Sequence, residues 1–181
     1  MGMLKEEYLP HYNYADYCQW EGNWELIYGQ AYAMSPSPTF EHQEIALAIA
    51  SELRSILKNC KNCKVVTEVD WKIQDDIVLR PDISLLCNIE NRGKFIHQAP
   101  NIIFEILSPS TQKQDKHLKY AIYEEQLVDY YVIVEPHTKT AYIHKLYDKS
   151  YQLESNFRDD KYNFLLDNCE IELDFSNIFE N

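Results

Sequence analysis

The sequence has little glycine, no long apolar run and a deficit of positive charge. Four of its 181 residues are glycine, and no glycine-, proline- or serine-rich linker divides the chain, so we expect one domain spanning residues 1–181. No apolar run approaches the roughly 20 residues that cross a bilayer. Acids stand near the N-terminus, where a signal peptide has an apolar core. These absences predict a cytoplasmic protein without a membrane partner.

Positive charge is scarce, with 17 lysines and arginines against 29 acids and a formal net charge of −12. This balance disfavours indiscriminate binding to nucleic acid. Its distribution is uneven, because residues 150–181 hold eight acids and two bases. Two basic runs, at residues 54–64 and 113–119, remain compatible with a polyanionic partner, although such runs are more often solvated faces.

The five cysteines are an odd number, and no secretion signal precedes them, which argues against a disulfide framework. Cys60 and Cys63 form a CxxC motif. A structural zinc site needs four ligands, however, and no second CxxC or histidine pair lies nearby. A redox CxxC would be expected next to a βαβ pattern. We therefore interpret residues 60–63 as a polar loop that follows a helix.

The hydrophobic pattern alternates between helical and extended periods. The clearest helix follows Thr39, a good N-cap residue, and has apolar residues at helical spacing from Ile45 to Leu57. A second helix is expected from about Gln112 to Glu125, with short helices at Tyr14–Gln19 and Phe175–Phe179. Expected strands are Val65–Ile73, Ile77–Cys87, Ile102–Leu107 and Tyr130–Glu135, with hairpins at Tyr28-Gly29 and between Thr140–Leu146 and Tyr151–Glu154. The order predicts an α/β core with a mixed central sheet flanked by helices, an N-terminal hairpin and a C-terminal antiparallel extension.

Two carboxylates interrupt apolar runs that are typical of buried strands. Asp82 follows Arg80-Pro81 at the start of one run, and Glu105 lies inside Ile102–Leu107. A buried carboxylate costs several kcal/mol unless a cation or a donor compensates it. If the two strands are neighbours, the two side chains can converge. Together with a backbone carbonyl and waters they would suit Mg²⁺ or Mn²⁺, which activates water and neutralises charge on a phosphate.

The same pattern also fits a purely structural role. Asp82 can cap the turn after Arg80-Pro81, and Glu105 can pair with a base such as Lys72, Arg80 or Lys119. Spacing alone favours this structural interpretation, so a more specific signal is needed to choose the metal site.

A more specific signal comes from the residues that follow Glu105. The phrase Glu105–Thr111, with Asp115 and Lys119 after it, resembles the Uma-two family, in the restriction-endonuclease-like PD-(D/E)XK phosphodiesterase superfamily. The resemblance extends from about Tyr14 to Phe179. It also rests on the hairpin Glu25–Gly29, the helix opening at His42, Arg80-Pro81-Asp82, Pro100–Phe104, Tyr123, Tyr131 and Glu135-Pro136.

The resemblance implies a metal-dependent phosphodiester hydrolase. Asp82 and Glu105 would bind the metal, and the backbone carbonyl of Ile106 would be a further ligand. The superfamily pattern has a lysine two residues after the glutamate, where this chain has Leu107. The family's replacement, a lysine on the following helix, corresponds to Lys119, which is expected to assist catalysis.

Three further residues are candidates for supporting roles. Asp115 and Lys119 are four residues apart and share one helix face, so they could also form a simple surface pair. His42 opens the long helix, where a histidine is more often structural. Glu68 alternates with its neighbours on a strand and could face the cleft. Glu25 matches the family phrase without an evident chemical role.

The expected function is therefore a Mg²⁺-dependent endonuclease that hydrolyses phosphodiester bonds in DNA through metal-activated water. The alternative from another class is a non-catalytic binding protein that keeps the fold, which the acidity and Leu107 favour. A nuclease for another nucleic acid or a nucleotide would share the site. Since a duplex has two strands to cut, a homodimer is compatible with the first function.

Overall fold

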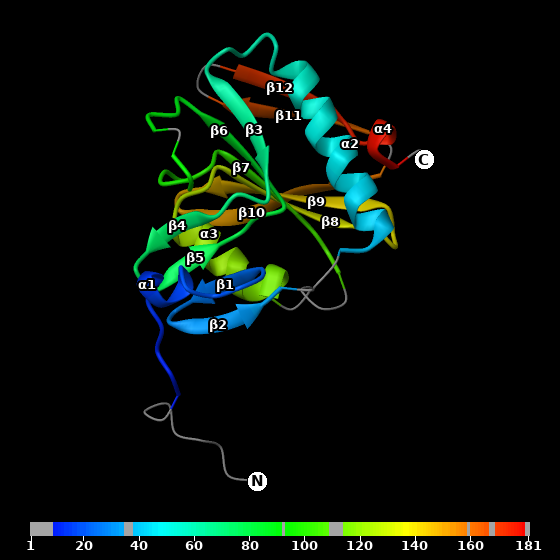
Figure 1. The fold of residues 1–181 in the computed structure, drawn as a ribbon. Coiled ribbons are helices and arrows are strands. Elements are labelled where there is room, and N and C mark those ends of the chain that lie inside the picture. Colours follow the sequence, from blue (N-terminus) through cyan, green and yellow to red (C-terminus); the bar gives the residue numbers. More distant parts are fainter. Residues whose placement is uncertain are drawn as a thin grey trace.

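The computed structural model describes residues 9–34, 38–91, 93–108, 114–158, 160–166 and 169–179, without the side chains at 114, 115, 155 and 157. A mixed six-stranded sheet forms its centre (Figure 1). From one edge to the other, the strands are β10 (Ser150–Phe157), β9 (Thr140–Tyr147), β8 (Tyr130–Glu135), β7 (Ile102–Ile106), β6 (Ile83–Cys87) and β3 (Cys63–Thr67). The pair β7–β8 is parallel and the other pairs are antiparallel, which confirms the predicted mixed sheet.

Two smaller antiparallel sheets accompany the central one. The first has the order β2-β1-β5-β4, with β1 (Trp24–Ile27), β2 (Gln30–Ala33), β4 (Trp71–Gln74) and β5 (Ile77–Leu79). The second is the hairpin of β11 (Lys161–Leu166) and β12 (Cys169–Asp174). The N-terminal hairpin is thus confirmed as β1–β2, and β9 to β12 form the C-terminal antiparallel extension.

The two long strands expected at 65–73 and 77–87 are wrong, because each is broken into two strands of different sheets. Glu68 has a positive φ of 52° directly after β3, and this left-handed backbone cannot continue an extended strand. Pro81 lies between β5 and β6 and has no N–H to donate to a ladder. These two breaks let the chain leave the central sheet and return to it.

The helices lie on both faces of the central sheet. They are α1 (Tyr14–Tyr17), α2 (Phe40–Ile56), the π-helical turn η2 (Gln114–Lys119), α3 (Tyr120–Glu125) and α4 (Ser176–Phe179). Thr39 caps α2 as predicted, since its Oγ1 accepts a hydrogen bond from the His42 N–H at 3.2 Å. None of the described helices is long and apolar enough to cross a membrane.

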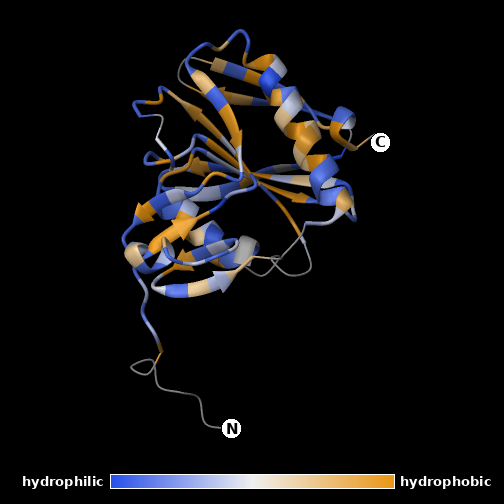
Figure 2. Ribbon diagram, viewed as in Figure 1, coloured by the Kyte–Doolittle hydropathy of each residue, from blue (hydrophilic) through white to orange (hydrophobic). Residues whose placement is uncertain are grey.

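Apolar residues gather in the central strands and along one stripe of α2 (Figure 2). On one face of the sheet, α2 and β12 pack over side chains such as Leu85 and Phe104. On the other face, α3 and the β4–β5 strands cover Ile103 and Leu107. Because side chains alternate along a strand, Glu105 shares the second face with Ile103 and Leu107.

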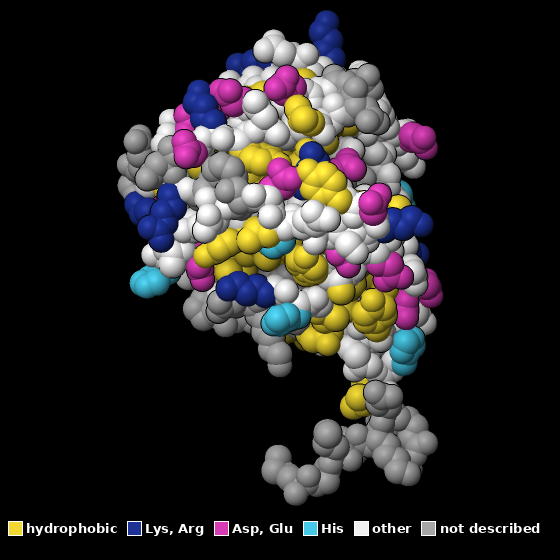
Figure 3. Space-filling model, turned by 180° about the vertical axis from the view of Figure 1, so that it is seen from behind, with side chains coloured by type: hydrophobic (Ala, Val, Ile, Leu, Met, Phe, Trp, Pro, Cys, Tyr) yellow, Lys and Arg dark blue, Asp and Glu magenta, His cyan; other side chains and the backbone are white. Residues whose placement is uncertain are grey.

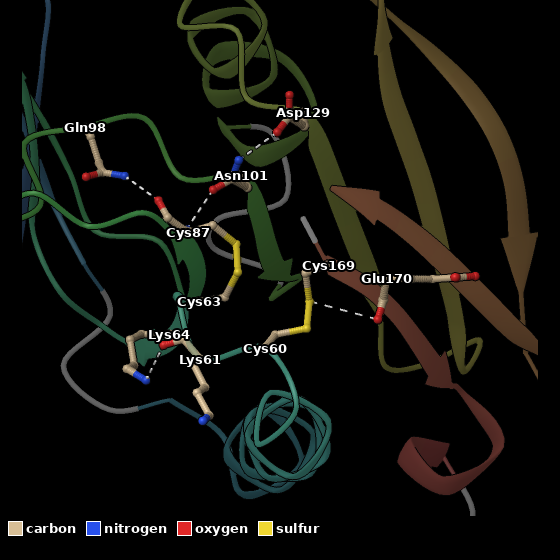
Figure 4. The surroundings of a disulfide bond; sticks show 10 residues. All are labelled: Cys60, Lys61, Cys63, Lys64, Cys87, Gln98, Asn101, Asp129, Cys169 and Glu170. Carbon is tan, nitrogen blue, oxygen red and sulfur yellow. Dashed lines mark hydrogen bonds between the residues drawn. A yellow bond between two sulfur atoms is a disulfide. The ribbon is translucent and has the colours of Figure 1, made fainter. Parts of the chain in front are cut away.

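The expectation that the cysteines form no disulfides is wrong. Cys60 is bonded to Cys169 and Cys63 to Cys87, and Cys18 is free and exposed (Figure 4). The CxxC does lie in the turn after α2, but the fold brings the ends of β6 and β12 to the same place. Neither partner can be read from spacing, since they lie 24 and 109 residues away along the chain.

Candidate active site

Asp82 and Glu105 meet at one end of the central sheet. Strands β6 and β7 are antiparallel neighbours with Ile83 opposite Phe104. Asp82 directly precedes β6, so the same register puts it opposite Glu105. On the other side of Asp82, the Glu68 N–H donates to the Asp82 carbonyl at 3.1 Å. Three of the four acids predicted as site residues, Glu68, Asp82 and Glu105, therefore form a row across three adjacent chain segments.

The Asp82 carboxylate is held between the end of β7 and the start of α2. Its Oδ2 accepts a hydrogen bond from the Ile106 N–H at 2.7 Å and lies 3.1 Å from His42 Nε2. The side chains of His42 and Asp82 are 10% and 13% exposed. Because the N–H and C=O of one strand residue point to the same side, the Ile106 carbonyl also faces the Asp82 side. These contacts bring together three of the predicted residues.

Lys119 joins two buried carboxylates. Its Nζ lies 2.9 Å from Glu105 Oε1 and 2.9 Å from Glu25 Oε1. All three side chains are at most 4% exposed, although they come from η2, β7 and β1. The Arg80 N–H adds a donor to Glu25 Oε1 at 3.0 Å. The Lys119 ammonium group thus compensates two carboxylates, with help from the Arg80 N–H. Buried charges need such partners, because they have lost their hydration.

Tyr123 is a second side-chain donor to Glu105. Its hydroxyl donates to Glu105 Oε1 at 2.6 Å, and its ring is fully buried. Burial, and next the nearby Glu105 charge, raise the pKa of Tyr123 well above its usual value. The hydroxyl therefore keeps its proton and remains a donor at neutral pH.

Of the three bases predicted as structural partners of Glu105, only Lys119 is seen to contact it in the described structure. Glu105 pairs with Lys119, one of the bases that the structural alternative also named, while Arg80 pairs with Asp70 at 2.6 Å and Lys72 with Asp75 at 3.6 Å. The exposed Glu68 side chain accepts from Gln43 at 3.3 Å.

Asp115 lies on η2, but its side chain is outside the described part of the structure, so its contact with Lys119 stays a prediction.

Sequence reasoning assigned no role to Glu25 or Tyr123. Both stand in phrases that carried the family resemblance, and Tyr123 is four residues after Lys119, which places it near the same helix face. That spacing was a usable signal for Tyr123. Glu25 lies 94 residues before Lys119, and no local pattern reveals such a contact.

The oxygen atoms of the site are of the kind that bind a hard divalent cation. Carboxylate and carbonyl oxygens from Asp82, Glu105 and Ile106 are the ligands that Mg²⁺ and Mn²⁺ prefer. Within the described ranges, no three His, Cys, Asp or Glu side chains are grouped so that they could hold a metal ion. Mg²⁺ commonly uses one or two carboxylates and keeps several waters. The residues present therefore suit an ion whose coordination is completed by water.

We expect Tyr123→Phe to lower the free energy of unfolding by about 1–3 kcal/mol, because Glu105 loses a buried donor to its charged form. Urea denaturation measures the loss. Tyr120→Phe is the matched control, since its hydroxyl makes only a 3.4 Å contact with the Tyr151 carbonyl. Equal losses in the two variants would show that the Tyr123 hydroxyl does not stabilise Glu105.

The mixed sheet with helices on both faces, and acids at the ends of adjacent strands, define the restriction-endonuclease-like α/β fold. Residues 14–171 match the sequence model of the Uma2 family, described as "Putative restriction endonuclease", and the chain belongs to this family.

Two solved structures show similarity of different extent. A crystal structure from Anabaena variabilis, described as a "putative nuclease belonging to DUF820", has a TM-score of 0.74 and 18% identity. The match covers 92% of this chain and 96% of that one, which shows a shared fold. A DrdV–DNA complex gives a TM-score of 0.34 and 12% identity over 64% of this chain and 12% of that one, too low to support an argument. No curated protein sequence matches the chain.

Proposed function

We propose that the protein is a Mg²⁺-dependent endonuclease that hydrolyses phosphodiester bonds in DNA. Family membership supports nuclease function in general. The observation that carries the proposal is the 2.9 Å contact between Lys119 Nζ and Glu105. Leu107 stands where the superfamily pattern has its lysine, and this contact brings an ammonium group back to the glutamate from η2.

Asp82, Glu105 and the Ile106 carbonyl would hold the ion. When bound, Mg²⁺ supplies a Lewis acid and lowers the pKa of a coordinated water. The chain's own residues have separate tasks in this proposal. The Ile106 N–H and His42 fix the orientation of Asp82, and Tyr123 fixes that of Glu105. Lys119 contributes a positive charge that favours the developing charge on the phosphate.

Affinity for DNA would come from the site more than from a broad basic surface. On the face shown in Figure 3, lysines and arginines lie scattered among acids, in keeping with the net charge of −12. Few phosphate contacts outside the site would give weak non-specific binding with a shallow salt dependence.

Isothermal titration with Mn²⁺ tests the proposed ion site directly. We expect binding at up to millimolar metal, weakened by about tenfold or more in Asp82→Asn, because one of two carboxylate ligands loses its charge. Glu44→Gln, an exposed acid on α2, is the matched control and should bind as the parent does. Absence of binding at millimolar metal would favour a non-catalytic binding protein instead.

Cleavage of a substrate panel then tests the DNA assignment. We expect Mg²⁺-dependent cutting of duplex DNA that a chelator stops. Cutting confined to RNA or to nucleotides would retain the site and overturn the assignment to DNA.

A further inference from the structure

Four of the five cysteines surround one cavity far from the candidate active site. The cavity has a volume of about 390 Å³, and its lining includes Cys60, Cys63, Cys87 and Cys169. Cys87 ends β6, the strand that Asp82 precedes, so this cavity lies at the opposite end of the strand. Figure 4 shows the two disulfides next to each other: Cys60–Cys169 joins the turn after α2 to β12, and Cys63–Cys87 joins β3 to β6. None of these four cysteines belongs to the candidate active site.

Backbone structure holds two of the cysteine-bearing segments together without help from the sulfur bonds. The Cys63 N–H donates to the Cys60 carbonyl at 3.0 Å, which closes the CxxC turn. Cys63 is paired with Cys87 in the antiparallel ladder of β3 and β6. The Asn88 N–H donates to the Asn62 carbonyl at 2.9 Å and ties the turn to the end of β6. Reduction of the disulfides would leave these contacts in place.

Packing holds the fourth cysteine near the other three. Cys169 begins β12, whose Ile171 and Leu173 are fully buried in the core that α2 covers. The hairpin partner β11 contributes the buried Phe164 to the same core. Apolar burial thus docks this hairpin against α2 and the central sheet, and Cys169 stays beside the turn in the reduced chain.

The surroundings of the cysteines favour negative charge. Lys61 and Lys145 line the cavity, and Lys64 Nζ lies 3.4 Å from the Lys61 carbonyl. Residues 53–67 contain no acid. Asp129 also lines the cavity, with its carboxylate accepting a hydrogen bond from Asn101 at 2.9 Å. Four thiolates around one divalent zinc ion carry two net negative charges, which the lysines would offset.

We propose that the reduced chain binds one Zn²⁺ through Cys60, Cys63, Cys87 and Cys169, and that the two disulfides are the oxidised form of this site. Four thiolates are a complete ligand set for a structural tetrahedral zinc site. The sequence shows only two of these ligands close together, and the fold supplies the other two. Because the zinc ligand is the thiolate and all four sulfurs are bonded in pairs, zinc binding requires reduction of both disulfides.

The two forms interconvert with a balanced exchange. Each disulfide takes two electrons and two protons from a dithiol reductant, which itself becomes a disulfide. The four thiols then release their protons as zinc binds. In the reverse direction, two molecules of a disulfide oxidant accept the four electrons and, with four protons from solvent, become dithiols, while the four thiolates form both sulfur–sulfur bonds and release Zn²⁺. Both forms link the turn after α2 to β3, β6 and β12. The hairpin of β11 and β12 would therefore be held by a disulfide in an oxidising compartment and by zinc in a reducing one.

Cobalt spectroscopy of the full chain tests this proposal. The protein is reduced with a phosphine, freed of reductant without air, and titrated with Co²⁺. We expect one Co²⁺ per chain, a thiolate-to-cobalt charge-transfer band, tetrahedral d–d absorption, and displacement by Zn²⁺. The thiolate band distinguishes this site from any carboxylate site, so the result is independent of nuclease activity.

Serine variants assign the ligands. Cys87→Ser and Cys169→Ser should each weaken Co²⁺ binding by about 100-fold or more, because each removes one of four thiolates. Cys18→Ser removes the exposed free cysteine and should leave binding unchanged. Circular dichroism checks that every variant is folded. Absence of a thiolate band in the reduced chain, or equal binding in Cys87→Ser, Cys169→Ser and the parent, would overturn the proposal and leave two structural disulfides.

Discussion

Glu105→Gln is expected to reduce metal-dependent cleavage by about 10³-fold or more, because the neutral amide is a poor ligand for a hard divalent ion. The substitution conserves shape, and the Tyr123 hydroxyl can still donate to the amide oxygen. Loss of activity should therefore occur in a folded protein. A plasmid-nicking assay with Mg²⁺ or Mn²⁺, alongside a urea denaturation curve, separates the two effects.

Two further variants define the result for Glu105. Asp82→Asn should lose activity to a similar extent, since it removes the charge of the second carboxylate ligand. Glu44→Gln, on the exposed side of α2, should cleave as the parent does. Undiminished cleavage in Glu105→Gln or Asp82→Asn would rule out the proposed metal ligands.

Lys119→Met is expected to abolish cleavage and also to lower the free energy of unfolding by about 3–5 kcal/mol. The ammonium group contacts Glu105 and Glu25, and all three groups are buried. Breaking a buried charge group by removing one partner leaves an uncompensated charge in the interior. Both quantities are measured on the same preparation, by nicking and by denaturation.

A double variant separates the contribution of Lys119 to stability from its contribution to cleavage. Adding Glu25→Gln to Lys119→Met removes one of the two carboxylates that lost a partner, so much of the stability should return. Cleavage should stay absent, because the double variant still lacks the Lys119 ammonium group beside Glu105. Recovery of both stability and cleavage would make Lys119 a structural ion-pair partner only, which is the alternative that spacing alone favoured.

Elements with strong local signals could be predicted from the sequence. The strand β8 has the expected bounds, Tyr130–Glu135, and α2 begins after the expected cap at Thr39. The apolar residues of α2 recur at helical spacing, and the short continuous apolar run of β8 is typical of a buried strand. In both segments, the local sequence and the tertiary packing favour the same secondary structure.

Elements that depend on a change of sheet could not be predicted. The apolar pattern of residues 65–87 continues through Glu68 and Pro81, yet the chain leaves and re-enters the central sheet there. Strands β11 and β12 were not predicted in the acidic tail, although an antiparallel extension was expected. The disulfides show the same difficulty, because pairing depends on which chain ends the topology brings together.

Some residues of the candidate site likewise had a local sequence signal, and others did not. Asp82 and Glu105 were identifiable because carboxylates in apolar strands are costly, and the fold makes those strands antiparallel neighbours as the hypothesis required. The contact of Lys119 with Glu105 follows the resemblance, not any local pattern. The contact of Glu25 with Lys119 joins β1 to η2 across separate sheets, and neither segment contains a signal of the other.

The most direct measurement of the central claim is a crystal structure of the protein soaked in Mn²⁺, with the ion located by its anomalous scattering. We predict one peak within about 2.0–2.3 Å of carboxylate oxygens of Asp82 and Glu105 and of the Ile106 carbonyl, with Lys119 beside it. A map without this peak at millimolar Mn²⁺, with Lys119 still joining Glu25 and Glu105, would contradict the account.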